Sequence, residues 1–333
     1  MFQMRVVRIL ICYFTVVGIM GCTFIIHYLN LLNARKPNFI ENSNALNLET
    51  IVPITLMAVG LDTSSSKRIL TRLQMPSRNI YTPGHTLNAS RICQEKGANL
   101  TLLIVVTSDT SHANERADVR RTWGQLGKEK GVAIGFSVGQ TDSSYTSRRI
   151  IEEEHTYGDI IQGNFIDVYD NLSLKTLSFL EWVNNYCSKV KFVLKTGDDT
   201  FINVPLILEL ATQHLDSHRS IFGKQVKNVM PVRDIFSKYY LSQEDFSSDT
   251  LPDFMSGGTY MMSADITSEL YIHALDTNFF KLEDVFFTGI IAKLLNINQV
   301  NVEGFVKETV PFDECEVKYS YVIHNLKHRE KVI

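Results

Sequence analysis

Two adjacent aspartates, Asp198 and Asp199, follow an apolar run in the stretch KFVLKTGDDTF, residues 191–201. Three interpretations are open: ligands of a divalent cation, a catalytic pair, or an acidic turn. The two carboxylates of a glycoside hydrolase face each other across the sugar, whereas adjacent residues of an extended chain point to opposite sides. A cation held by carboxylates balances the charge of a departing diphosphate, which suits a nucleotide-sugar donor. On these residues alone an acidic turn stays open.

The surrounding sequence predicts the elements that would position the aspartates. Apolar runs predict strands at 102–107, 132–138, 191–194 and 220–223, and helical spacing of apolar residues predicts helices at 172–187 and 206–215. This alternation is typical of an α/β domain with a mainly parallel sheet flanked by helices. Ligands of such sheets bind beyond the carboxyl ends of the strands, where the aspartates would lie.

The N-terminal residues predict a membrane anchor. Residues 9–26 hold no charge and follow Arg5 and Arg8, which favours an uncleaved signal anchor over a cleaved signal peptide. We expect a cytoplasmic tail at 1–8, a transmembrane signal anchor at 9–27, a polar stem at 28–95 and a catalytic domain at 96–333. Three glycosylation sequons, at Asn88, Asn99 and Asn171, all follow the anchor and favour a lumenal domain.

Composition narrows the function further. The net charge of −3 and the lack of a long run of like charges argue against nucleic-acid binding. Beyond the anchor the cysteines are Cys93, Cys187 and Cys315, an odd number that allows one disulfide, one free thiol and three pairings.

Five motifs in order give the chain a specific resemblance. From about residue 100 to 325 it resembles the β1,3-galactosyltransferase and β1,3-N-acetylglucosaminyltransferase family, glycosyltransferase family 31. The motifs are RADVRRTWG at 116–124, FIDVYDNLSLKT at 165–176, KTGDDTFIN at 195–203, SGGTY at 256–260 and EDV at 283–285.

The resemblance implies a fold, a location and a reaction. The fold is a GT-A-like, Rossmann-type domain behind an N-terminal transmembrane helix and stem, in a type II protein of the Golgi membrane. The donor is UDP-galactose or another UDP-hexose, used with a divalent cation, usually Mn²⁺. The reaction is an inverting transfer of galactose, or of an N-acetylhexosamine, to a hydroxyl of a glycan on a glycolipid or glycoprotein. A β1,3 linkage is expected, and homo-oligomers or hetero-oligomers with other glycosyltransferases are possible partners.

The resemblance also assigns roles to single residues. Asp284 is expected to be the base that deprotonates the acceptor hydroxyl, and Asp199 the principal metal ligand with His324 as a second. The residues expected to bind the donor are Arg116, Arg120, Lys195, Asp198, Asp199, Gly257 and Gly258. The alternative for Glu283 and Asp284 is that they only complement a helix dipole.

Gly197 departs from the family pattern, because it stands where the family has the first of three aspartates. An aspartate there would be expected to contact the ribose of the nucleotide or metal-bound water. We therefore keep a second hypothesis, in which the chain is a catalytically impaired family member that binds glycan or a partner glycosyltransferase.

Overall fold

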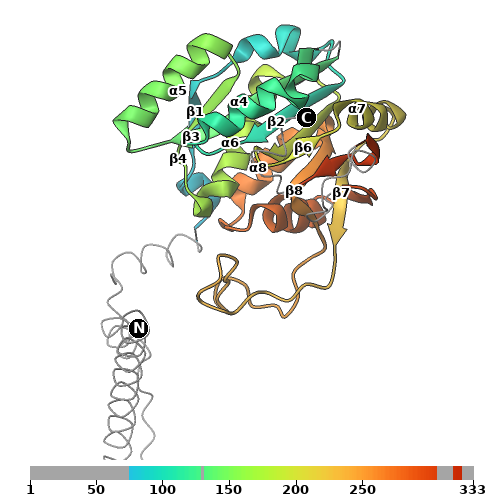
Figure 1. Cartoon of the computed structure of the whole chain (residues 1–333). Helices are drawn as coiled ribbons and strands as arrows, with labels where there is room; N and C mark the ends of the chain where they lie inside the picture. Colours follow the sequence, from blue (N-terminus) through green and yellow to red (C-terminus); the bar gives the residue numbers. More distant parts are fainter. Residues whose placement is uncertain (1–74, 129–130, 306–317, 325–333) are drawn as a thin grey trace, which may run out of the picture. The chain divides into compact units, whose positions relative to one another are not determined.

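The computed structural model describes residues 75–128, 131–305 and 318–324, all within one compact unit, Ser64–Ile333 (Figure 1). The expected tail and anchor, residues 1–27, lie outside the described residues. In the part of the chain that is described, no helix has the length and apolar character needed to cross a bilayer.

A mixed sheet of eight strands forms the centre of this unit, in the order β1-β4-β3-β2-β5-β8-β7-β9. The strands β2, β3, β4 and β5 run parallel to one another, while β8 runs antiparallel to both β5 and β7. The strands are β1 Thr82–Leu87, β2 Leu102–Thr107, β3 Val132–Gln140, β4 Ile160–Ile166, β5 Phe192–Gly197, β7 Ser220–Val226, β8 Phe254–Ser263 and β9 Asn298–Asn301. The short strands β6 Phe201–Ile202 and β10 Val322–Ile323 pair separately.

Helices cover both faces of the sheet (Figure 1). One face carries α6 Leu172–Tyr186, α8 Thr267–Asp276 and a π-helix, Val285–Ile291, that continues into α9 Ala292–Leu294. The other carries α4 Ala113–Arg121, α5 Ser144–Tyr157 and α7 Val204–Gln213. The α/β architecture and the expected strands and helices are confirmed.

The central strand β2 shows why the sequence forms two cores. All of its apolar side chains are buried, as expected for a strand covered on both faces. Because successive side chains point to opposite faces, Leu103 and Val105 pack with α6, while Ile104 and Val106 pack with α4 and α7.

The expectation of a mainly parallel sheet needs correction, because β1, β7 and β8 bring in antiparallel pairs. The long segment between β7 and β8, residues 227–253, returns the chain to the sheet beside the strand it has just left. Two neighbouring strands joined without a crossover must be antiparallel.

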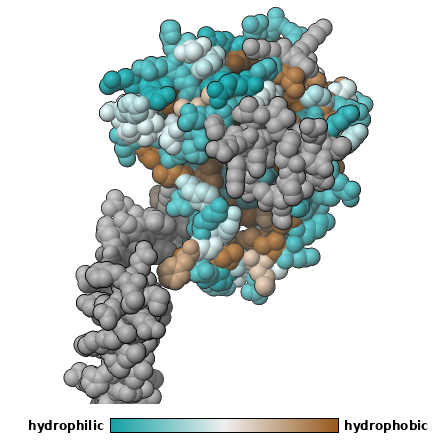
Figure 2. Space-filling view, in the orientation of Figure 1, coloured by the Kyte–Doolittle hydropathy of each residue, from teal (hydrophilic) through white to brown (hydrophobic). Residues whose placement is uncertain are grey.

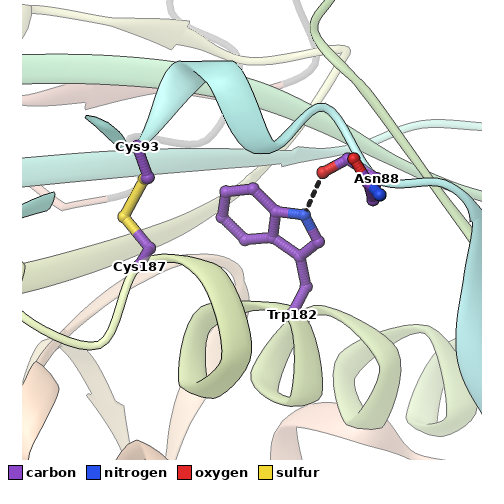
Figure 3. Close-up of a disulfide and its surroundings, with 4 residues drawn as sticks. All are labelled: Asn88, Cys93, Trp182 and Cys187. Atoms are coloured by element: carbon purple, nitrogen blue, oxygen red, sulfur yellow. Dashed lines mark hydrogen bonds between the residues drawn. A yellow bond between two sulfur atoms is a disulfide. The ribbon is translucent and has the colours of Figure 1, made fainter. Parts of the chain in front are cut away.

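The folded domain also begins earlier than residue 96. Strand β1 pairs antiparallel with β4 at the edge of the sheet, so residues 75–95 belong to the domain rather than to the expected stem. A disulfide joins Cys93 to Cys187 at the end of α6, and the indole of Trp182 donates to the carbonyl of Asn88 nearby (Figure 3). Of the three pairings left open, this is the one formed, and Cys315 lies outside the described residues.

The three sequons differ in their surroundings. Asn88 and Asn99 are exposed, which suits a glycan acceptor. Asn171 is 8% exposed and its side-chain amide donates to the carbonyl of Ile166 at 2.7 Å. Asn171 is therefore the least exposed of the three sequons, and its glycosylation stays a prediction.

Loss of the disulfide should destabilise the domain. The bond closes a loop across a sequence separation of 94 residues. Replacing Cys93 and Cys187 by serine should lower the free energy of unfolding by about 2–4 kcal/mol, measured by denaturant or thermal unfolding. Cys315→Ser is the matched control, since it leaves this disulfide intact. Equal stability of the double variant and the control would contradict the prediction.

Candidate active site

The candidate site lies along one edge of the sheet. The parallel strands β2, β4 and β5 all end there, and the antiparallel strand β8 begins there. In the register, Thr107 of β2 faces Gly197 of β5, and Thr196 of β5 faces Thr259 of β8. Residues 108–112, 167–169, 198–200 and 256–258 are therefore brought to the same edge.

Asp198 is directed into the protein. It is 7% exposed, and its Oδ2 accepts from Ser108 Oγ at 2.6 Å and contacts His112 Nδ1 at 2.9 Å. The hydrogen bond with Asp198 is the largest cause that raises the pKa of His112 above its ordinary value. Asp198 thus ties the end of β5 to the loop after β2, and an internal role replaces direct contact with the donor.

Asp199 and His324 lie close together, as a shared metal site would require. Asp199 Oδ1 lies 3.6 Å from His324 Nδ1, and the two side chains are 46% and 29% exposed. The hydroxyl of Thr200 lies between them, 3.2 Å from Asp199 Oδ1 and 3.1 Å from His324 Nδ1. The pairing of β6 with β10 brings His324 here from 124 residues further along the chain.

Gly197 leaves the space that the Asp199 carboxylate fills. A Cβ built on Gly197 would lie 2.6 Å from Asp199 Oδ1, too close for the present conformation. An aspartate at 197 would therefore require Asp199 to rotate away. The glycine at 197 thus allows the present position of the Asp199 carboxylate.

Two glycines of β8 separate the proposed base from the proposed metal ligands. A Cβ on Gly257 would lie 2.8 Å from Asp284 Oδ2, while one on Gly258 would lie 3.5 Å from His324 Nδ1. Successive positions of a strand face opposite sides, so the two groups flank β8. The amide of Gly257 donates to Asp284 Oδ2 at 3.0 Å, an approach that a side chain at 257 would prevent. Gly257 and Gly258 therefore shape the site by their small size.

A buried ion pair fixes the start of the helix that carries Asp284. Lys195 Nζ lies 3.0 Å from Glu283 Oε2 and donates to the carbonyl of Gly257 at 2.7 Å. Glu283 Oε1 accepts from Tyr260 Oη at 2.5 Å and from Thr176 Oγ1 at 2.9 Å. Lys195 is 7% exposed and these two contacts hold the site in position, while a direct contact between Lys195 and the donor stays a prediction.

Asp284 has the environment of a general base. Burial is the largest cause that raises its pKa to about 6, and the charge of Glu283 adds to it. Lys195 and the amides of Val285 and Gly257 oppose this rise. A carboxylate of this pKa is ionised near neutral pH, yet is a better proton acceptor than an ordinary aspartate.

The π-helix that follows Asp284 holds it in place. Such helices are rare and often occur at functional sites. Within it, Thr288 is fully buried, and its hydroxyl donates to the carbonyl of Asp284 at 2.5 Å and accepts from the amide of Met255 at 2.8 Å. The helical run that begins at Glu283 therefore contains a π-helical segment, Val285–Ile291, before it continues as α9.

Arg116 and Arg120 are structural residues in this fold, contrary to the expected donor contacts. Arg116 is fully buried, forms two 2.8 Å bonds to Glu153 and donates to the carbonyl of Asp109. Arg120 forms a two-bond pair with Asp159 at 2.7 and 2.8 Å. A diphosphate would have to displace these carboxylates.

Sequence reasoning missed His112 and Ser108, which contact Asp198. The available signal was their position, directly after a buried strand at the carboxyl edge, since polar residues there commonly face the ligand crevice. Neither belongs to the five motifs.

The sequence of this domain also matches a known family. A family model described as Galactosyltransferase matches residues 114–303. The chain belongs to this family. The resemblance carried by the five motifs is thereby confirmed, and the site lies within the matched residues except for Ser108, His112 and His324.

Individual relatives agree with this assignment. The chain is 35% identical to beta-1,3-galactosyltransferase 5 of Homo sapiens over 233 residues, 68% of this chain and 75% of that protein. It is 32% identical to beta-1,3-galactosyltransferase 1 of Mus musculus over 248 residues, 73% of this chain and 75% of that protein. Among solved structures, a galactosyltransferase named LgtC, in complex with donor and acceptor sugar analogues, matches at 12% identity and a TM-score of 0.33. That match covers 68% of this chain and 87% of LgtC.

The raised pKa of Asp284 predicts a pH dependence of sugar transfer. Below about pH 6 the carboxyl is protonated and cannot accept a proton, and above it the carboxylate is ionised. We expect kcat/KM to fall about tenfold per pH unit on the acid side of this value. The measurement is a pH profile of transfer by the full chain. If the residual kcat/KM of Asp284→Asn falls in the same way below about pH 6, the group that titrates is not Asp284.

Proposed function

We propose that this family member is a Golgi type II membrane enzyme with a GT-A-like fold that transfers galactose, or another hexose, from a UDP-sugar to an acceptor glycan. The expected linkage is β1,3 and the expected course is inverting. One observation carries the proposal: a carboxylate suited to act as base and an Asp199–His324 pair suited to a cation flank the same strand. The printed activity of the relatives supports the choice of galactose.

The inverting reaction needs one base and one departing diphosphate. In a single displacement, the acceptor hydroxyl oxygen forms a bond to the anomeric carbon while the bond from that carbon to the UDP oxygen breaks. The hydroxyl proton passes to a carboxylate oxygen of Asp284. The backbone amides of Gly257 and Val285 hold that carboxylate in orientation.

Asp199 and His324 fit a hard divalent cation such as Mn²⁺. A carboxylate oxygen and an imidazole nitrogen are suitable ligands, and both side chains reach solvent. Among the described residues, no third acidic, histidine or cysteine side chain joins them, so diphosphate and water oxygens would complete the shell. Such a cation supplies charge neutralisation of the leaving diphosphate.

The second hypothesis, a catalytically impaired member, rests on Gly197. The experiment that distinguishes this hypothesis from the proposed enzyme is an assay of the full chain, solubilised in detergent, with a panel of UDP-sugars and glycan acceptors in Mn²⁺. Formation of a linked disaccharide and UDP supports the enzyme. Glycan binding without turnover supports the impaired member, and sugar release without nucleotide would indicate a hydrolase.

Asp284→Asn should abolish transfer with little effect on UDP binding. The amide cannot accept the proton, so kcat should fall about 10²- to 10⁴-fold. The measurement pairs kcat with UDP affinity in Mn²⁺. Asp253→Asn, which changes an exposed carboxylate just before β8, is the matched control and should retain transfer. Retained transfer by Asp284→Asn would exclude Asp284 as the base.

Asp199→Ala should weaken Mn²⁺-dependent UDP binding. Loss of the carboxylate removes one of two proposed protein ligands, and we expect at least about a tenfold rise in the Kd for UDP. The measurement is calorimetric titration of UDP with and without Mn²⁺. Asp216→Ala, at an exposed position between α7 and β7 on the opposite edge of the sheet, is the control. An unchanged Kd would place the cation elsewhere.

A further inference from the structure

The segment between β7 and β8 brings aromatic side chains to the site edge. It leaves the sheet after Val226 and returns at Phe254, the end of β8 that lies beside Gly257. Figure 1 shows this segment projecting from the body of the domain below β7 and β8. Tyr239 and Lys238 belong to it, while Tyr169 comes from the turn after β4 at the same edge.

Tyr169, Lys238 and Tyr239 form one cluster. The Lys238 ammonium lies 5.3 Å from the ring centroid of Tyr169 and 4.9 Å from that of Tyr239. The two tyrosines are 43% and 47% exposed. Each ring therefore keeps accessible surface, and the phenol and ammonium groups supply hydrogen-bond donors beside it.

The cluster lies on the side of the proposed base. Tyr169 lies three residues before the start of α6, and Thr176 of that helix donates to Glu283, the neighbour of Asp284, at 2.9 Å. Ser173 of the same helix donates to the carbonyl of Phe280 at 2.5 Å, so the start of α6 lies beside the residues that lead to Asp284. Asp199 and His324 lie on the other side of β8, so a ligand on the cluster would approach Asp284 opposite the donor diphosphate.

The projecting segment is held in a defined conformation. The Arg233 guanidinium donates to the carbonyls of Leu241, Ser242 and Phe246 at 2.9, 2.6 and 2.7 Å. Leu241 is fully buried, and the ring of Phe246 packs against Phe280. A surface fixed in this way binds a ligand with a smaller loss of conformational entropy.

The same segment exposes apolar side chains to an unusual degree. Phe236 is 91% exposed, Met230 72% and Ile235 67%. Figure 2 shows hydrophobic surface in this lower part of the domain. Exposed apolar residues gathered in one segment are typical of a surface that contacts a ligand.

We propose that Tyr169, Lys238 and Tyr239 form the subsite that binds the terminal pyranose ring of the acceptor glycan. The inference rests on the proposed function and names the acceptor side of that same site. The C–H face of the ring packs on the exposed tyrosine surface, and sugar hydroxyls bond to the phenol and ammonium groups. The hydroxyl that is glycosylated then faces Asp284.

The test separates acceptor binding from donor binding. The probe is the acceptor that the unaltered full chain uses best from a panel of neutral β-linked hexosides and N-acetylhexosaminides. Tyr239→Ala should raise the acceptor KM about tenfold, because it removes one aromatic surface. The donor KM and the Kd for UDP in Mn²⁺ should stay within about twofold. Tyr239→Phe should retain most of the acceptor affinity, because it keeps the ring.

Tyr157→Ala is the matched control. Tyr157 is 55% exposed and carries the Arg120 guanidinium 4.1 Å from its ring centroid, but it lies at the end of α5, on the opposite edge of the sheet. The Tyr157→Ala variant should leave the acceptor KM unchanged. An unchanged acceptor KM in Tyr239→Ala, or an equal rise in donor KM, would overturn the proposed subsite. Absence of any UDP-sugar turnover in the unaltered chain would instead refute the proposed function.

Discussion

The buried ion pair between Lys195 and Glu283 is the interaction on which the rest of the site depends. It joins β5, which delivers Asp198 and Asp199, to the residue that precedes Asp284. Tyr260 and Thr176 complete the bonds of Glu283, so β8 and α6 are tied to the same point. Removal of one member of such a pair leaves a buried charge and costs about 3–5 kcal/mol. The position of Asp284 therefore depends on four elements that are distant in sequence.

The same pair also sets the electrostatics of the edge. Glu283 places a negative charge beside Asp284, and Lys195 partly compensates for it. Burial is the largest cause that raises the pKa of Asp284 to about 6, and the charge of Glu283 adds to it, so the carboxylate has a high proton affinity and is still ionised near neutral pH. Beyond β8, Asp199 and His324 are more exposed and free of this pair. The small residues Gly257 and Gly258 of β8 thus separate Asp284, the proposed base, from Asp199 and His324, which are suited to a cation.

Much of this arrangement could be predicted from sequence, and the failures have one cause. Apolar runs identified β2, β3, β5 and β7, and the EDV and KTGDD motifs indicated the residues that meet at the edge. The partners of charged side chains were not predictable. Arg116 and Lys195 have the chemistry of anion ligands, and only the folded chain shows that Glu153 and Glu283 already occupy them. The antiparallel direction of β8 and the start of the folded domain at β1 were not predictable either, because strand pairing depends on contacts between residues that are distant in sequence.

The disulfide has a mechanical consequence for a chain that enters its folded domain from a long N-terminal segment. Any tension that arrives from before residue 75 acts first on the backbone hydrogen bonds that join Met75 and Ser77 to residues 277–279 after α8, and then on the bonds between β1 and β4. If those bonds yield, the load passes to the covalent link between Cys93 and the end of α6. That link shares the force between the backbone that leads into β2 and the end of α6. The disulfide therefore limits how far residues 75–92 can be pulled away from the rest of the domain.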